Sequence, residues 1–334
     1  MFHPAHRATA RPSTKAAASG HDDVQLSEDE DANIEERLSG KDISEGRGMG
    51  LLIRRALSRG RNAHCDPQRF ESYYAGSVLR HRPSPLIVQM PLVEAAVDTL
   101  QSAQSAERAG AGRIELCASL NDAGTTPSAG LIAACAKGCR IPVFVLIRPR
   151  GGSFVYTKAE FQIMLRDIEV AKSLGAGGIV SGVLEPGGKI DVEQTRALVQ
   201  AADGLPVTFH RAFDFTPNLG ESLEGLIAAG VTRVLTSGGA NTALEGAPRI
   251  SVLVKQGGGR MTLIAGGGVR ESNVREVLTL TGVSEVHARI SSIVGGTGSL
   301  RRPQIKLRKK FPDDETAWAE LDEGRMRDLV RETV

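Results

Sequence analysis

Short β-rich runs alternate with helical segments between about residue 92 and residue 331, and no other feature restricts the fold as strongly. Strands are expected at about 92–98, 113–119, 142–149, 178–184, 206–213, 233–238, 261–266 and 285–289. Helices are expected at about 99–109, 129–137, 158–174, 192–202, 219–229, 243–255, 273–280 and 316–331. An eightfold strand–helix repeat over residues 90–334 predicts an α/β fold, the (β/α)8 TIM barrel of about 250 residues. A doubly wound open sheet is the alternative, because alternation alone does not prove closure.

Polar residues at the end of the fifth run point to a functional site. Between Val207 and Asp214 an apolar strand pattern is interrupted by His210 and Arg211. Successive side chains on a strand alternate between faces, so Thr208, His210 and Asp214 are expected on one side. Because TIM-barrel active sites lie at the carboxyl ends of strands, this polar face predicts a site there.

The residues before the barrel differ from the rest in composition. The 334 residues are 41% hydrophobic and 24% charged, which is typical of one soluble globular domain. The first 85 residues have few apolar residues at any period, so they cannot bury enough surface to offset the entropy of ordering. We therefore expect a disordered N-terminal extension over residues 1–85, with a short helix near 50–58, and a barrel domain over residues 90–334.

Charge and hydropathy argue against two classes of partner. The net charge is only +2, so we expect no nucleic acid, and no apolar stretch approaches the roughly 20 residues of a membrane span. Four cysteines in a chain of this length fit a reducing compartment. We expect a cytoplasmic protein, with a nuclear location also open. Mitochondrial import fits less well, because Pro4 and Pro12 interrupt the basic N-terminal stretch.

Several ordered motifs resemble those of a known family. They are Arg113-Ile114-Glu115-Leu116-Cys117, Thr126-Pro127-Ser128, Ile147 to Gly152, Thr208 to Asp214, Leu235 to Gly239, Gly266 to Arg270 and Glu285-Val286-His287. In content and order they are similar to the motifs of the copper homeostasis protein CutC family, over about residues 92–334. The resemblance implies a (β/α)8 barrel, an intracellular protein, copper(I) binding, a role in copper tolerance, and homo-oligomers.

Copper(I) prefers thiolate and thioether ligands and accepts imidazole, which leaves few candidates here. The metal-ligand candidates at the barrel mouth are Cys117, His210 and His287. A single cysteine on a strand is also typical of a small buried apolar residue. Cys135 and Cys139 are the alternative pair, because residues i and i+4 of a helix share one face, although a barrel helix lies outside the strand ends.

Charged residues at inward strand positions favour acid–base chemistry. The expected inward set is Glu94, Glu115, Arg148, His210, Thr236 and His287. Glu94 and Glu115 can form an acid–base pair or share Arg148 as a counter-ion. The catalytic candidates are Glu94, Glu115, His210 and Asp214, with His210 the best single one because its ordinary pKa lies near physiological pH. A structural ion-pair cluster and a core histidine are the alternative interpretations.

Two arginines and two glycine-rich turns predict an anion site at the same rim. Arg148 and Arg150 end the third run, and guanidinium groups bind carboxylate or phosphate. The turns after the sixth and seventh runs precede helices, so their backbone N–H groups can bind an anion. The candidate anion-binding residues are Arg148, Arg150, Thr236, Ser237, Gly238, Gly239, Gly266, Gly267 and Gly268. Tight strand-to-helix turns are the other explanation of the glycines.

Two hypotheses of function follow from the sequence. The first is an intracellular copper(I)-binding barrel of the CutC type. The second is a barrel enzyme that acts on a small phosphorylated or carboxylated metabolite, with copper tolerance as an indirect consequence. The sequence names neither a substrate nor a reaction for the second.

Overall fold

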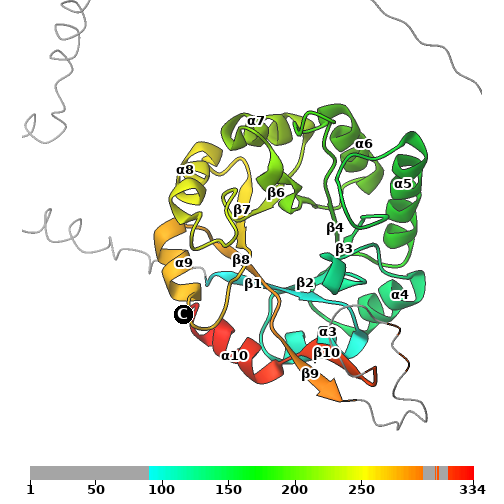
Figure 1. Cartoon of the computed structure of the whole chain (residues 1–334), viewed down its shortest axis with the longest axis vertical. Coiled ribbons are helices and arrows are strands. Elements are labelled where there is room, and N and C mark those ends of the chain that lie inside the picture. The colour runs from blue at the N-terminus through cyan, green and yellow to red at the C-terminus, as the bar shows by residue number, and fades with distance from the viewer. Residues whose placement is uncertain (1–89, 296–304, 306, 308–314) are drawn as a thin grey trace, which may run out of the picture. The chain divides into compact units, whose positions relative to one another are not determined.

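The computed structural model describes residues 90–295, 305, 307 and 315–334, and in it eight parallel strands form a closed barrel in chain order (Figure 1). The strands are β1 (Leu92–Val97), β2 (Arg113–Leu116), β3 (Val143–Leu146), β4 (Gly178–Ser181), β5 (Val207–Phe209), β6 (Arg233–Thr236), β7 (Thr262–Gly266) and β8 (Glu285–Ala288). The predicted TIM barrel is confirmed, and the open sheet is excluded because β8 pairs with β1. The predicted extension over 1–85 and the helix near 50–58 lie outside the described residues.

A ring of helices surrounds the barrel (Figure 1). Its members are α3 (Leu100–Arg108), α4 (Ala129–Gly138), α5 (Lys158–Ser173), α6 (Val192–Ala202), α7 (Leu219–Ala229), α8 (Ala247–Gly257), α9 (Val274–Thr281) and α10 (Glu323–Arg331). Outward strand residues such as Ile114 and Val234 share one buried cluster with helix residues such as Leu198 and Leu226. Side-chain caps start several helices, and these caps are Thr99, Ser128, Thr157, Asp191, Asn218 and Asp322. None of the helices in the described part of the chain is long and apolar enough to cross a membrane.

The chain leaves β5 earlier than the sequence predicts. A strand is expected over 206–213, but Arg211–Phe215 form the 3-10 helix η4. His210 caps this helix, since its Nδ1 accepts a hydrogen bond from the Ala212 N–H at 3.2 Å. The prediction that Asp214 shares a strand face with His210 is therefore wrong, because side chains do not alternate in a 3-10 helix.

The eighth strand–helix unit contains a small extra sheet. The sequence predicts one helix over 316–331, but β9 (Ser291–Gly295) and β10 (Ala317–Leu321) pair antiparallel and only α10 is helical. Pairing with β9 satisfies the backbone of β10, so the helix begins only after Asp322, whose side chain accepts a hydrogen bond from the Arg325 N–H. The predicted helix is therefore wrong over its first part.

Glu320 of β10 fastens this extra sheet to α3. One of its carboxylate oxygens accepts hydrogen bonds from Thr99 Oγ1 at 2.9 Å and from Ser102 Oγ at 2.5 Å. The Leu321 N–H in turn donates to Ser102 Oγ at 3.0 Å. The last strand–helix unit is thereby attached to the first, beside the closure between β8 and β1.

Side chains inside the barrel lie in levels. In a closed eight-stranded barrel the strands tilt, so residues at one height come from alternate strands. The strand register gives four levels from the amino ends of the strands to their carboxyl ends. The first level contains Arg113, Gly178, Arg233 and Glu285, and the second contains Glu94, Phe144, Thr208 and Ile264. The third level contains Glu115, Val180, Leu235 and His287, and the fourth contains Ala96, Leu146, His210 and Gly266. Branched apolar residues usually fill such levels, so the charges of the first three are a departure that requires pairing.

The attachment by Glu320 generates a stability prediction. Replacing Glu320 with Ala removes hydrogen bonds to a charged acceptor and should lower the free energy of unfolding by about 1.5–3 kcal/mol. Urea denaturation followed by circular dichroism measures this loss. Glu169→Ala is the matched control, because its partner Arg166 is 75% exposed and such a pair contributes only about 0–1 kcal/mol. Equal losses in the two variants would contradict the proposed attachment.

Candidate functional site

A chain of alternating charges crosses the lower interior of the barrel. Glu285 Oε1 lies 3.3 Å from Arg233 Nη2, and Glu285 Oε2 lies 2.6 Å from Arg113 Nη2. The Nε of Arg113 then donates to Glu94 Oε2 at 2.5 Å. Both guanidinium groups lie over the ring of Phe144, at 4.9 Å for Arg113 and 5.9 Å for Arg233. Each buried charge in this chain therefore has a partner of opposite sign.

His287 continues the chain to a second glutamate. Its Nδ1 lies 2.8 Å from Glu94 Oε1, and its Nε2 lies 3.5 Å from Glu115 Oε2. Burial alone would raise the pKa of Glu94, but the hydrogen bond from His287 and the charge of Arg113 lower it to about 2. Burial raises the pKa of Glu115 to about 7, and the charge of Glu94 adds to the rise.

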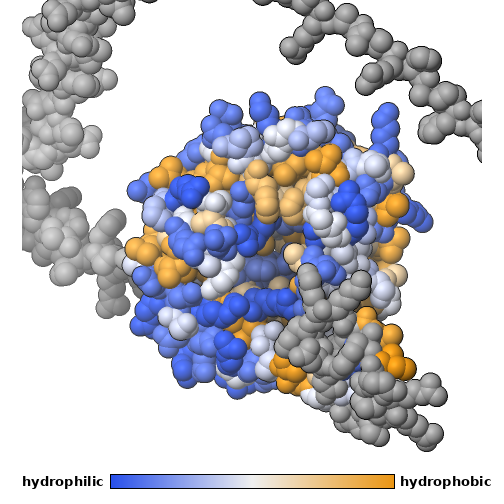
Figure 2. Space-filling model, in the orientation of Figure 1, coloured by the Kyte–Doolittle hydropathy of each residue, from blue (hydrophilic) through white to orange (hydrophobic). Residues whose placement is uncertain are grey.

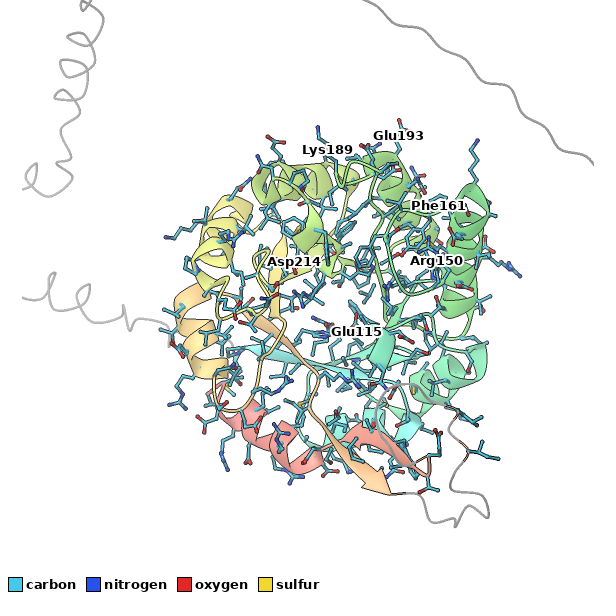
Figure 3. All side chains as sticks on the ribbon, in the orientation of Figure 1. Glu115, Arg150, Phe161, Lys189, Glu193 and Asp214 are labelled. Carbon is cyan, nitrogen blue, oxygen red and sulfur yellow. The ribbon has the colours of Figure 1, made fainter. Side chains whose placement is uncertain are left out.

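The two glutamates beside His287 therefore have different roles. Burial would lower the pKa of His287, but the carboxylates of Glu115 and Glu94 raise it above its ordinary value. Glu94 stays an anion that holds the imidazole in place, whereas Glu115 exchanges a proton near neutral pH. Figure 3 shows Glu115 inside the ring of strands. A carboxyl group that exchanges a proton near pH 7 is suited to general acid–base catalysis.

Polar atoms without a partner line the wall opposite β1. Among the described residues, Thr208 Oγ1, His210 Nε2 and Arg233 Nε are buried and have no hydrogen-bond partner. Thr208 and Arg233 are register partners on β5 and β6, and His210 follows β5 directly. The strands close in chain order, so β5 lies across the barrel from β1. In the space-filling view a recess lies over the middle of the ring (Figure 2).

Cys117 follows β2 on the inner side of the barrel, in an apolar setting. The residues packed around it are Phe144, Leu146 and Val180. Burial, followed by the charge of Glu115, raises the pKa of the Cys117 thiol well above its ordinary value. Cys135 belongs to the separate core between strands and helices, so the sheet divides it from Cys117. Cys117 therefore lies apart from the alternative pair Cys135 and Cys139, and copper binding by either set stays a prediction.

The donor atoms of Glu94, Glu115 and His287 lie within 4.8 Å of one another, which is close enough for one metal ion. Two carboxylates and an imidazole suit hard or borderline divalent cations, whereas copper(I) prefers sulfur. Both ring nitrogens of His287 also face carboxylates already. This cluster therefore does not fit copper(I).

Arg148 and Arg150 hold the loops above β3. The Nη1 of Arg148 donates to the carbonyl oxygens of Asp122 at 3.0 Å and Gly124 at 2.6 Å. Arg150 pairs at 2.5 Å with Glu160, which also closes the capping box of α5, and Figure 3 shows Arg150 on that side of the barrel. The protein's own acceptors thus engage most of the donors predicted for an external anion. The buried Nε of Arg148 has no partner among the described residues.

Asp214 occupies the glycine-rich turn after β6. Its carboxylate accepts hydrogen bonds from Thr236 Oγ1 at 2.5 Å and from the N–H groups of Ser237 and Gly239, each at 3.0 Å. Arg211 Nε donates to the same carboxylate at 2.8 Å. An internal carboxylate therefore binds the donors that the sequence predicts for an external anion.

The turn after β7 lies beside a different arginine. A Cβ added at Gly267, where φ is 102°, would lie 3.0 Å from Arg211 Nη1. A Cβ added at Gly266 would lie 2.5 Å from Leu235 and 3.2 Å from His287, so Gly266 belongs to the interior. Gly268 also has a positive φ, 70°. The structure thus brings Arg211 to this turn, and the convergence of the predicted anion groups on one site stays a prediction.

Several site residues escape the sequence-based reading. They are Arg113, Arg233 and Glu285, whereas Arg211 is seen in the sequence only as part of the polar run after the fifth strand. Arg113 and Glu285 had a usable signal, because each stands two positions before a predicted inward residue of its own strand. Thr236 is predicted to face inward, but the inward residue of β6 at this height is Leu235, which lies beside Gly266. That prediction is wrong by one position.

Comparison with known proteins then identifies the family. The CutC family model matches residues 91–292. The chain belongs to the CutC family. The match contains all eight barrel strands and every residue of the charge chain, and it confirms the resemblance seen in the motifs.

The alignments with this CutC chain span most of the length of each relative. The copper homeostasis protein cutC homolog of Mus musculus is 42% identical over 238 residues, which are 71% of this chain and 88% of the mouse protein. A family protein CutC of Xylella fastidiosa strain Temecula1 is 46% identical over 213 residues, 64% of this chain and 80% of that protein. The crystal structure of CutC from Streptococcus agalactiae matches with a TM-score of 0.57 and 37% identity, and covers 59% of this chain and 98% of that one.

The raised pKa of Glu115 predicts a pH-dependent stability difference. Between its ordinary pKa of 4.5 and about 7, Glu115 ionises in the unfolded chain but stays protonated in the folded one, so wild-type stability falls as pH rises through this window. Glu115→Gln has no such proton and should gain roughly 2–3 kcal/mol relative to wild type between pH 4.5 and 7.5. Denaturant titrations of both proteins across this range measure the difference. A difference that does not change with pH would show that Glu115 ionises as it does in water.

Proposed function

We propose that the chain is an enzyme that performs general acid–base chemistry on a small carboxylated or phosphorylated metabolite bound above Glu115. The observation that carries this proposal is Glu115 itself, a buried carboxyl group with a pKa of about 7 that lies 3.5 Å from His287 Nε2. A purely structural ion pair has no use for a proton that exchanges near neutral pH. The buried Nε2 of His210 supports the proposal, because it lies at the level above Glu115, has no partner among the described residues, and can be satisfied by a ligand there.

The residues beneath Glu115 support this role. Arg113 and His287 hold Glu94 as an anion, and Glu94 in turn orients the His287 imidazole and helps to raise its pKa. Glu115 is thus the member of the chain that can give or take a proton without leaving an unpaired buried charge on Arg113. Above Glu115 the next level contains Leu146, His210 and the small residues Ala96 and Gly266, and a ligand that enters from the mouth would bind over the two small residues.

The name of the family is compatible with such an enzyme. Copper homeostasis in the relatives' names describes an outcome in a cell, and a metabolic activity can alter copper tolerance indirectly. The interior cluster of Glu94, Glu115 and His287 supports an indirect effect on copper tolerance, because it suits proton transfer better than copper(I) binding.

Solvent deuterium uptake tests the acid–base proposal. The purified protein is incubated in D2O with a panel of small sugar phosphates and of 2-oxo and 2-hydroxy acids, and incorporation of deuterium is followed by mass spectrometry. Glu115→Gln should slow uptake by about 10²-fold or more, the usual contribution of a general acid or base. Glu169→Gln on the exposed face of α5 is the control and should match wild type. Uptake that is equal in Glu115→Gln and wild type would refute the role of Glu115.

The second candidate is copper(I) binding at Cys117, which the relatives' names and the position of this thiol support. Cys117 stands two positions after Glu115, inside the barrel toward the mouth. A copper(I) ion would replace the thiol proton and neutralise the thiolate that burial disfavours. In this role Cys117 supplies the sulfur ligand, with His210 as the imidazole ligand, because both ring nitrogens of His287 already face carboxylates.

Competition with a copper(I)-specific chelator tests this candidate. Loss of metal ligands in Cys117→Ser combined with His210→Ala should weaken copper(I) binding by at least about 10-fold. Cys135→Ser combined with Cys139→Ser is the matched control and should leave the affinity unchanged. The reverse pattern would move copper(I) to α4, and equal affinities in all three proteins would leave Cys117 without this role.

A further inference from the structure

The His210 ring presents one defined hydrogen-bond donor to the barrel interior. Its Nδ1 accepts the Ala212 N–H at 3.2 Å, so in the neutral ring the proton lies on Nε2. The Nε2 atom is buried and has no partner among the described residues, and only 6% of the residue is exposed. A buried N–H donor without an acceptor costs free energy, and a ligand oxygen at this position would recover it.

The surroundings of the ring fix its orientation. A Cβ added at Gly182 would lie 2.6 Å from the His210 ring, so only glycine leaves room for the imidazole there. The ring of Phe154 packs against the other side, with 4.9 Å between ring centres. Held between these residues and by the hydrogen bond to Nδ1, the ring cannot turn its donor elsewhere without losing contacts.

The ring also stays uncharged. Burial, followed by the charge of Arg148, lowers the pKa of His210 to about 3. His287, the other histidine of the interior, has its pKa shifted in the opposite direction by two carboxylates. Two histidines with opposite shifts indicate different roles, because the environment assigns which one carries charge.

The level structure places this donor close to Glu115. His210 belongs to the level directly above that of Glu115 and His287, and it comes from the strand opposite β1. The same level contains Leu146 and the small residues Ala96 and Gly266, and these two take up little of the space between the ring and Glu115. A small molecule in this space contacts a neutral N–H donor on one side and a proton-exchanging carboxyl group on the other.

We propose that the Nε2–H of His210 donates a hydrogen bond to the carbonyl oxygen of the substrate, and that the substrates are small compounds with a C–H bond next to that carbonyl. The inference rests on the proposed acid–base function and names its substrate class. Glu115 as carboxylate takes the proton from this carbon, and the C–H electron pair forms a C=C bond. The π electrons of the carbonyl move to its oxygen, which becomes an enolate oxygen.

His210 stabilises the enolate oxygen through its hydrogen bond and does not transfer its own proton. Return of the proton from Glu115 to the same or the neighbouring carbon completes exchange or isomerisation, and no other reactant is required. A neutral imidazole suits this step better than an imidazolium, because it polarises the carbonyl without protonating the enolate.

Oxalate, a planar dianion that resembles an enediolate, is the probe. Its binding is measured by calorimetry on the full chain, and the ring nitrogens are observed by NMR with ¹⁵N-labelled histidine. In the wild-type protein His210 should carry its proton on Nε2 between pH 5 and 8, and millimolar oxalate should shift that resonance. A proton on Nδ1, or a resonance that oxalate does not move, would overturn the proposal.

Two variants separate the functions of the ring nitrogens. His210→Asn keeps an acceptor for the Ala212 N–H but removes the interior donor, and should weaken oxalate binding by at least about 10-fold. His210→Gln places an amide N–H near the position of Nε2 and should restore much of the affinity. Equal binding by wild type and His210→Asn would overturn the proposal, because oxalate would then not use the donor of His210. Unchanged melting temperatures confirm that both variants fold.

Glu115→Gln distinguishes failure of this inference from failure of the proposed function. Oxalate binding that depends on His210 but deuterium uptake that does not depend on Glu115 would refute the acid–base function and leave an anion-binding site at His210. Deuterium uptake that depends on Glu115 but occurs at carbons not adjacent to a carbonyl would refute the substrate class and keep the acid–base function.

Discussion

Arg113 between two buried glutamates is the contact on which the interior of this barrel depends. A buried guanidinium group costs several kcal/mol unless it is paired, and Arg113 is paired with both Glu94 and Glu285. Because this arrangement keeps Glu94 ionised, His287 is held by its Nδ1, and the carboxylates of Glu115 and Glu94 raise its pKa. Burial and the neighbouring anion Glu94 raise the pKa of Glu115 to about 7, against the opposing effect of His287. The pKa values of Glu115 and His287 in the upper interior thus depend on Arg113 at the lowest level of the barrel.

The barrel could be predicted from the sequence because local periodicity and strand–helix alternation determine it. The two segments that were mispredicted are those where tertiary contacts decide the conformation. His210 ends a strand pattern because its own side chain caps the 3-10 helix that follows. Residues of β10 have helical composition but extend, because β9 offers hydrogen-bond partners from distant sequence. Neither contact is visible in a window of neighbouring residues.

The alternation of side chains between strand faces was enough to place Glu94, Glu115, His210 and His287 inside the barrel. It could not predict which of these groups are protonated. Their protonation depends on distances between side chains of different strands, which the barrel register sets. The alternation also failed for Thr236, where an error of one position exchanges the two faces. The pairing of Asp214 with the turn after β6 joins residues more than 20 positions apart, so the residue types alone gave no sign that an internal carboxylate fills it.

Asp214 in that turn acts as an intramolecular competitor for any ligand with a phosphate or carboxylate. A tethered carboxylate has an effective concentration that free metabolites rarely match, so an entering anion has to displace it from Thr236, Ser237 and Gly239. The turn consequently has its final shape before a ligand arrives, and its ordering contributes nothing to selectivity. If the proposed function holds, discrimination among metabolites falls to the few small and neutral surfaces beside His210, which would sort compounds by size and by the position of a single oxygen.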